Sequence, residues 1–166
     1  MSEVGIHHDF LGCFGLLKRE GAWLLVGNHR ELSVGAPPTL VFDLPGGRVE
    51  AGETLEETLI REWHEECCLE IEVGPFAFVQ EGVRVVGGQR RYAWRSFFFE
   101  VSCVGEPKAA SEIKSLLWCP EPRLAEILQA PYHQGFVRYL AGEGRSRYEF
   151  DTWEAQGDDY GMRTPR

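Results

Sequence analysis

Long apolar runs are missing from this chain of 166 residues. No stretch approaches the roughly 20 apolar residues that a membrane-spanning helix needs. The opening residues, MSEVGIHHDF, also lack a basic segment followed by an apolar one, so we expect no signal peptide. We therefore expect a cytoplasmic protein that does not enter a membrane. The length suits one domain, and residues 1–166 are expected to form it.

An excess of basic residues is missing as well. The 17 Lys and Arg residues are outnumbered by 26 Asp and Glu residues, and the formal net charge is −9. Tight binding to nucleic acid or to an anionic membrane relies on a basic surface, so we expect neither as a partner. A small phosphate-bearing ligand remains compatible with this charge, because a bound metal ion could screen its phosphates.

Cysteines spaced for metal binding or for a disulfide framework are also absent. The number of cysteines is odd, and none forms a C-x-x-C pair: Cys13, Cys67, Cys68, Cys103 and Cys119. The spacing predicts neither a structural zinc site nor a set of disulfides. Reduced thiols buried in a cytoplasmic protein are the expectation that remains.

Short apolar and alternating runs predict strands along most of the chain. The predicted strands are residues 10–17, 22–27, 39–44, 69–86, 92–104 and 113–119. Helical periodicity appears at residues 54–67, and more weakly at 123–129 and 132–142. Because strands dominate and one helix lies between them, the order predicts an α+β protein with helices covering a mixed sheet. The polar tail, residues 143–166, carries four aromatic residues, so we expect it to pack on the domain or on a partner in a homodimer.

The central predicted helix has two distinct sides. Thr54 and Glu57 have the spacing of a capping box. At about 100° per residue, one sector should face the core, and it holds Leu55, Leu59, Trp63 and Cys67. The adjoining sector holds Glu62, Glu65 and Glu66. Such an acidic face costs only a few tenths of a kcal/mol when exposed, so energy alone does not separate a solvated surface from a cation site.

The spacing around these glutamates resembles the Nudix box of the Nudix hydrolase family. Five residues separate Gly47 from Glu53, and the run Arg61-Glu62-x-x-Glu65-Glu66 follows seven residues later, before Leu69. At about 7% usage each, six fixed identities coincide with a probability of about 10⁻⁷ per position. The resemblance implies the Nudix fold, an α/β/α sandwich around a mixed sheet. It also implies hydrolysis of a pyrophosphate linkage in a nucleoside diphosphate joined to another group.

The resemblance also assigns roles within the box. Glu62, Glu65 and Glu66 would bind Mg²⁺, or Mn²⁺ in its place, through the oxygen ligands that hard cations prefer. Gly46 or Gly47 would add a backbone carbonyl. Glu62 would be either a metal ligand or the base that accepts the proton of the attacking water, and both roles stay open. Arg61 would pair with Glu53 and hold the loop on the helix.

Further candidates lie outside the box. Glu112 stands before a predicted strand, where many family members carry another acidic ligand, and Glu81 is the second choice. Arg84 and Arg91 flank the predicted hairpin. They are candidates for binding substrate phosphates, and the alternative is that they keep an edge strand soluble.

Two positions depart from the family pattern. Cys68 replaces a glycine expected just beyond the helix end, where a left-handed conformation would cost a cysteine roughly 1 kcal/mol. Trp63 replaces an aliphatic residue, so the core must accommodate a larger ring. His64 is expected to lie on the surface or in packing rather than in the site.

Two other functions compete with hydrolysis. A Nudix-fold sensor or regulator could bind nucleotides without cleaving them, but the intact set of arginine and glutamates argues against this. A structural or interaction protein could have the same fold and use the edges of its sheets to bind a partner. A requirement for Mg²⁺ in phosphate or nucleotide release separates hydrolysis from both alternatives.

Overall fold

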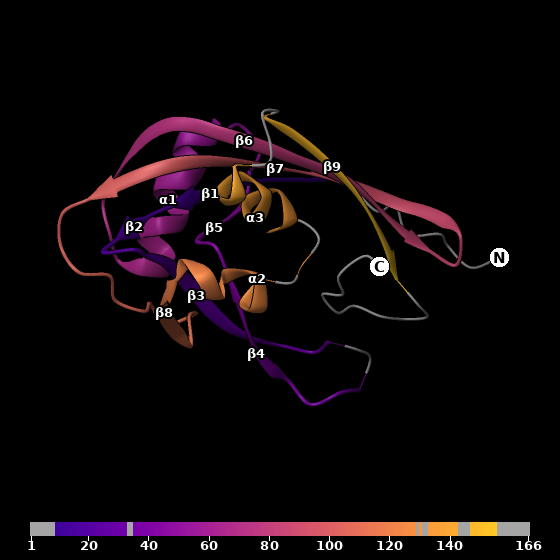
Figure 1. Ribbon diagram of the computed structural model, residues 1–166, viewed down its shortest axis with the longest axis horizontal. Helices are drawn as coiled ribbons and strands as arrows, with labels where there is room; N and C mark the ends of the chain where they lie inside the picture. The colour runs from indigo at the N-terminus through magenta and orange to yellow at the C-terminus, as the bar shows by residue number, and fades with distance from the viewer. Residues whose placement is uncertain (1–8, 33–34, 129, 131–132, 143–146, 156–166) are drawn as a thin grey trace.

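Two β-sheets and the helices that cover them make up the fold, which a computed structural model describes for residues 9–32, 35–128, 130, 133–142 and 147–155 (Figure 1). The larger sheet has the strand order β5-β1-β7-β6-β9. Its strands are β5 (Gly46–Arg48), β1 (Phe10–Leu16), β7 (Gln89–Cys103), β6 (Ile71–Val86) and β9 (Tyr148–Ala155). The β1–β7 and β6–β9 pairs are parallel, and β1–β5 and β6–β7 are antiparallel, so the sheet is mixed.

The smaller sheet is antiparallel and joins four strands. They are β2 (Lys18–Arg19), β3 (Ala22–Arg30), β4 (Thr39–Asp43) and β8 (Ser115–Pro120). The KREG run between residues 10–17 and 22–27 predicts a hairpin turn that would pair these two segments. That pairing is wrong, because β1 and β3 belong to different sheets. Instead β2 turns back onto β3 through Glu20 and Gly21, both of which have positive φ.

Helices cover both faces of the larger sheet, as the α+β prediction requires. On one face α1 (Leu55–Cys67) packs its buried residues against Cys13 and Val101. On the other face Phe136 of α3 (Gln134–Ala141) packs against Phe78 and Phe98. The 3₁₀ turn η1 (Glu121–Arg123) and the single-turn helix α2 (Leu124–Ile127) complete this layer. In the described part of the chain, no helix is long and apolar enough to cross a membrane.

The β6–β7 hairpin extends away from α1, and β9 runs beside it (Figure 1). The tail was expected only to pack on a surface, whereas its described part forms the strand β9 along β6. Tyr148 and Phe150 on this strand are about half exposed. The side chain of Trp153 and the whole of Tyr160 lie outside the described residues.

Candidate metal and active site

The helix α1 begins at a capping box, which positions every acidic residue that follows. The Thr54 hydroxyl accepts a hydrogen bond from the Glu57 N–H (3.2 Å), and the Glu57 carboxylate accepts one from the Thr54 N–H (2.8 Å). Two N–H groups that lack helical partners are thereby satisfied. The predicted core side is confirmed, because the buried residues of the helix include Leu59, Trp63 and Cys67. Leu55 is partly buried against the same cluster.

The large ring of Trp63 is accommodated by a glycine on β1. A Cβ atom at Gly15 would lie 2.4 Å from Trp63 Nε1, so only glycine leaves the ring its place. Trp63 is completely buried. Gly15 thus leaves room for the larger ring of Trp63, and α1 still lies close to the sheet.

The glycine pair that enters the box brings the β5 backbone close to α1. Gly46 has φ +145°, and a Cβ there would lie 2.2 Å from the Cys13 carbonyl oxygen. A Cβ at Gly47 would lie 2.3 Å from Glu62 Oε1. Both positions therefore need glycine. At Gly46 the reasons are the positive φ and the close backbone of β1, and at Gly47 the reason is the close approach of the Glu62 carboxylate.

Two of the three clustered glutamates are drawn into this contact. Glu66 Oε2 accepts a hydrogen bond from the Gly46 N–H (2.9 Å). Burial raises the pKa of Glu66 to about 8, and the charges of Glu62 and Asp43 act in the same direction. Burial also raises the pKa of Glu62, against the lowering effect of Arg61. Two partly buried carboxylates close to each other are costly to ionise, and a cation between them would reduce that cost.

Arg61 holds the loop and the helix together. Its Nε and Nη2 atoms donate to the two oxygens of Glu53 (2.7 and 3.0 Å), which is a bidentate pair. Nη2 also donates to the Arg48 carbonyl (3.1 Å), and Nη1 donates to Glu62 (2.9 Å) and Glu65 (3.2 Å). The Arg61 hydrogen bonds lower the pKa of Glu53 to about 2. Glu65 is the most exposed of the three clustered glutamates.

Asp43 and His133 border the same place, and sequence reasoning missed both. Asp43 Oδ1 contacts Nε2 of His133 (2.5 Å), which donates because a carboxylate oxygen only accepts. The guanidinium of Arg30 lies 3.6 Å from Asp43 Oδ2. A charged residue directly before the LPGG turn was a signal in the sequence. His133 lies 90 residues further on, so no local pattern could connect the two.

The four predicted outer residues are not brought against Glu66. Glu112 is exposed in the turn before β8, although Ala110 donates to the Glu66 carbonyl and places this segment beside the end of α1. Arg84 is buried in β6, and Arg91 is exposed near the tip of the β6–β7 hairpin, at the end remote from α1 (Figure 1). Glu81 pairs with Arg95 (2.6 Å) and accepts from Tyr148 (2.9 Å), so it is engaged elsewhere.

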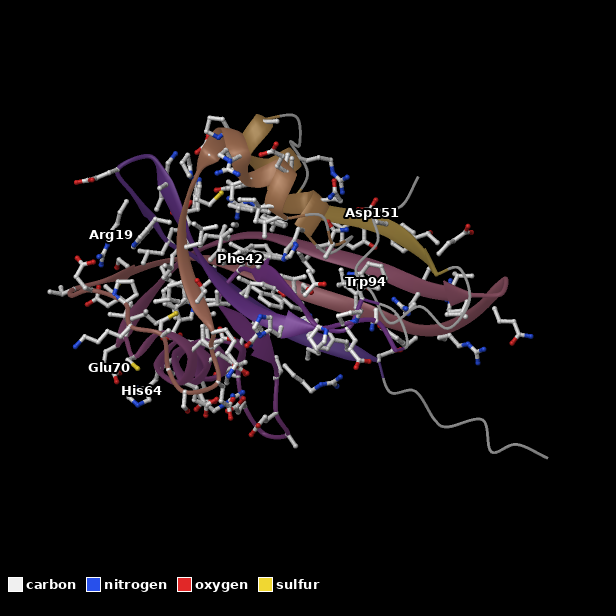
Figure 2. All side chains as sticks on the ribbon, turned by 90° about the horizontal axis from the view of Figure 1, so that it is seen from below. Arg19, Phe42, His64, Glu70, Trp94 and Asp151 are labelled. Atoms are coloured by element: carbon white, nitrogen blue, oxygen red, sulfur yellow. The ribbon has the colours of Figure 1, made fainter. Side chains whose placement is uncertain are left out.

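His64 lies on the surface, where its Nδ1 is 2.9 Å from Glu70 Oε1 (Figure 2). Cys68 follows the helix in a left-handed conformation, with φ 53° and ψ 37°. Its N–H donates to the His64 carbonyl (3.1 Å), and this bond caps the end of α1. The cysteine thus adopts the backbone conformation that a glycine would hold more easily.

Replacing Cys68 with glycine should stabilise the protein by about 0.5–1 kcal/mol. The left-handed conformation costs a residue with a Cβ about 1–2 kcal/mol, and the greater freedom of glycine in the unfolded chain offsets part of the gain. Chemical denaturation measures the free energy of unfolding. Cys68→Ala is the matched control, because it removes the thiol but keeps the Cβ. A Cys68→Gly protein no more stable than Cys68→Ala would contradict this reasoning.

The residues around the loop fit a hard divalent cation. Their donors are carboxylate and backbone carbonyl oxygens, which Mg²⁺ prefers, and burial raises the pKa of both Glu62 and Glu66 there. As the side chains stand, no three carboxylate, thiol or imidazole groups in the described ranges converge on one point. Glu65 is the ligand candidate that must turn inward, since its carboxylate pairs with Arg61.

Comparisons with known proteins identify the family of this chain. The model of the NUDIX domain matches residues 7–140. A stretch of 108 residues, 63% of this chain, is 32% identical to the putative 8-oxo-dGTP diphosphatase 2 of Mycobacterium tuberculosis and covers 73% of that protein.

Solved structures share the fold at lower identity. The ORF135 protein of E. coli aligns with a TM-score of 0.65 and 22% identity, over 83% of this chain and 92% of that one. The mutator MutT protein of Bacillus halodurans aligns with a TM-score of 0.64 and 21% identity, over 90% and 92%. From the family match over most of its length and the site geometry together, the chain belongs to the NUDIX domain family and is a Nudix pyrophosphohydrolase.

Proposed function

We propose that this protein uses Mg²⁺ to hydrolyse a pyrophosphate linkage in a nucleoside diphosphate joined to another group. The observation that carries the proposal is the burial of Glu62 and Glu66 against the Gly46–Gly47 turn, with the pKa of Glu66 raised to about 8. Such an arrangement is unfavourable for a merely structural acidic face. It is useful for binding a divalent cation, and Nudix hydrolases generally use one.

Each residue of the site has a proposed role. Glu62, Glu65 and Glu66 and the carbonyl of Gly47 would hold the cation, and Glu112 remains a predicted additional ligand. Mg²⁺ bound there would offset the charge on the phosphate oxygens and promote ionisation of the attacking water. Glu62 is the candidate for receiving the proton of that water. Arg61 orients Glu62 while Glu53 holds Arg61 in place.

The substrate is proposed to be a nucleotide. Support comes from the relative in M. tuberculosis, whose description names it as a putative 8-oxo-dGTP diphosphatase. We therefore place 8-oxo-dGTP and ordinary nucleoside triphosphates first among the compounds to test. Nucleotide sugars and dinucleoside polyphosphates follow. Arg84 and Arg91 remain predicted contacts for substrate phosphates, and their positions on the hairpin make them candidates for substrate that extends along the sheet.

Incubation of the purified chain with this panel tests the proposal. We expect hydrolysis of at least one nucleotide with Mg²⁺ or Mn²⁺ and none in EDTA. Mass spectrometry of products formed in ¹⁸O-labelled water would show which phosphorus atom is attacked. A folded protein that releases no product from any compound with either metal would overturn the proposal. Saturable nucleotide binding without turnover would instead support the sensor alternative.

A further inference from the structure

In the described part of the larger sheet, two buried side-chain oxygen atoms on neighbouring strands have no hydrogen-bond partner. Gln80 on β6 and Ser96 on β7 are paired in register, and their side chains are 0% and 1% exposed. Throughout the described ranges, no group forms a hydrogen bond with Gln80 Oε1 or Ser96 Oγ. Buried polar atoms are almost always satisfied in folded proteins, so an adjacent pair of exceptions indicates a missing partner.

The orientation of the Gln80 amide follows from its neighbours. Its Nε2 donates to Asp151 Oδ2 (2.9 Å) and to the Glu81 carbonyl (3.3 Å). Both of these oxygens can only accept, so the amide nitrogen must face them and Oε1 must face away. Arg138 on α3 donates to the same Asp151 oxygen (2.8 Å) and holds the carboxylate in place. Oε1 is thereby fixed as an acceptor that needs a donor.

The surroundings of this pair are aromatic. Alternation along each strand places Gln80 on the same face as Phe78, and Ser96 on the same face as Phe98 and Trp94. The Trp94 ring crosses to β6 and lies on Gly82, where a Cβ would be 2.1 Å from it. Figure 2 shows Trp94 and Asp151 on this side of the sheet, next to β9. A flat apolar ligand with a polar edge matches such a site.

A single row of paired residues connects this place with the glycine loop. Arg48 follows Gly47 and pairs with Gly12, which pairs with Ser96, which pairs with Gln80. At a strand spacing of about 4.8 Å, Ser96 lies roughly 10 Å and Gln80 roughly 14 Å from β5 along the row. A nucleotide whose phosphates lie at the loop could therefore bring its base to the pair.

We propose that Gln80 and Ser96 bind the edge of a nucleobase, with Asp151 positioning Gln80. The ligand is a planar nitrogen heterocycle whose edge carries an N–H beside an acceptor. The N–H donates a hydrogen bond to Gln80 Oε1, and the acceptor accepts a hydrogen bond from the Ser96 hydroxyl. Both protein atoms are covered in the free protein, so the side chains that cover them must move when the base enters.

The strand that supplies Asp151 lies beyond the part of the chain that the NUDIX model matches. The NUDIX match ends at residue 140, whereas β9 spans Tyr148–Ala155. The proposal rests on the proposed function in one respect, which is that the phosphates of the nucleotide bind at the glycine loop. What it adds is that Asp151, on a strand beyond the matched residues, orients the Gln80 amide that contacts the base.

Ser96→Ala is the sharpest test, because the Ser96 hydroxyl has no partner to lose in the free protein. Binding of the four deoxynucleoside monophosphates is measured by calorimetry in EDTA, beside 2-deoxyribose 5-phosphate, which lacks a base. We expect the variant to bind the preferred nucleotide about tenfold more weakly, or about 1.4 kcal/mol. Binding of the sugar phosphate should not change. Ser102→Ala, an exposed site on the same strand, is the matched control and should bind as the wild type does.

Thermal unfolding of the same proteins tests whether a buried water is the missing partner of the Ser96 hydroxyl. The proposal expects Ser96→Ala to unfold at the wild-type temperature or above, because an unpaired buried hydroxyl is removed. A variant that is less stable but binds nucleotide normally would show that the hydroxyl serves a buried water, and would overturn the proposal. Failure of all four nucleotides to bind the wild type would also overturn it.

Asp151→Ala tests the contribution of β9 separately. Without the carboxylate the Gln80 amide is free to turn, so we expect weaker nucleotide binding and unchanged sugar phosphate binding. Thr152→Ala, an exposed neighbour on the strand, is its control. Unchanged nucleotide binding in a folded Asp151→Ala protein would remove Asp151 from the site. Turnover with Mg²⁺ is measured apart from these titrations, so a failure of hydrolysis contradicts the proposed function and leaves the binding result to stand.

Discussion

Glu66→Gln is expected to abolish Mg²⁺-dependent hydrolysis and, at the same time, to stabilise the metal-free protein at pH 8. Burial raises the pKa of Glu66 from 4.5 to about 8, so the folded protein holds a proton there that the unfolded chain releases. The rise corresponds to a destabilisation on the order of 5 kcal/mol once the carboxylate is ionised. Glutamine carries no charge, and its Oε1 can still accept the hydrogen bond from Gly46.

The pH dependence has a defined direction. Below pH 4.5 Glu66 is protonated in both states and contributes no difference. Between pH 4.5 and about 8 the folded state binds more protons than the unfolded state, so the stability of the wild type falls as pH rises. The Glu66→Gln variant should lack this loss. Denaturation in EDTA at pH 5 and pH 8 measures the difference.

Activity provides the second half of the same experiment. We expect turnover with Mg²⁺ to fall at least 1,000-fold, because a neutral amide does not balance the charge of the cation and binds it less well than a carboxylate does. Glu56→Gln, an exposed acid in the first turn of α1, is the matched control and should change neither property. Near-wild-type turnover in the Glu66→Gln protein would sink the assignment of Glu66 to the site.

Local signals carried most of the correct predictions. The helix α1 was expected over residues 54–67 and spans Leu55–Cys67, since its capping box and its buried side depend on residues within a few positions of one another. The crowding of Glu62 and Glu66 on one side of the helix is likewise a local property. Fold class followed from the same patterns, because the order of strands and helices restricts how layers can cover each other.

Partners distant in sequence could not be predicted in this way. The separation of β1 and β3 into two sheets depends on which strand each one pairs with, and the alternation of side chains is the same in either case. The contact of Asp43 with His133 and the neighbourhood of Gln80, Ser96 and Asp151 also join distant segments. The alternating YEFDTWEA run did contain a strand signal, but the polar composition of the tail obscured it.

Arg61→Lys should lower turnover by about 10- to 100-fold, although the positive charge is kept. The guanidinium donates to Glu53, Glu62, Glu65 and the Arg48 carbonyl. An ammonium group offers one compact centre and cannot reproduce this planar fork. Groups that orient a metal ligand typically contribute 10- to 100-fold to activity. The measurement is kcat at saturating Mg²⁺, with Arg123→Lys, an exposed arginine on η1, as control.

Arg61→Met extends the test to stability through the pH dependence of Glu53. The arginine lowers the pKa of Glu53 to about 2, so the folded wild type resists protonation of this group. The stabilisation is present above pH 4.5 and is lost as pH falls toward 2, because there the unfolded chain binds the proton first. Without the guanidinium, the fall in stability between pH 4.5 and about 2 should become smaller. The fall in stability between pH 4.5 and about 8, which Glu66 causes, should persist. An Arg61→Met protein with the wild-type acid profile would show that Glu53 is held by its other partners, Thr58 and the Glu50 N–H, and that Arg61 does not couple the loop to the helix.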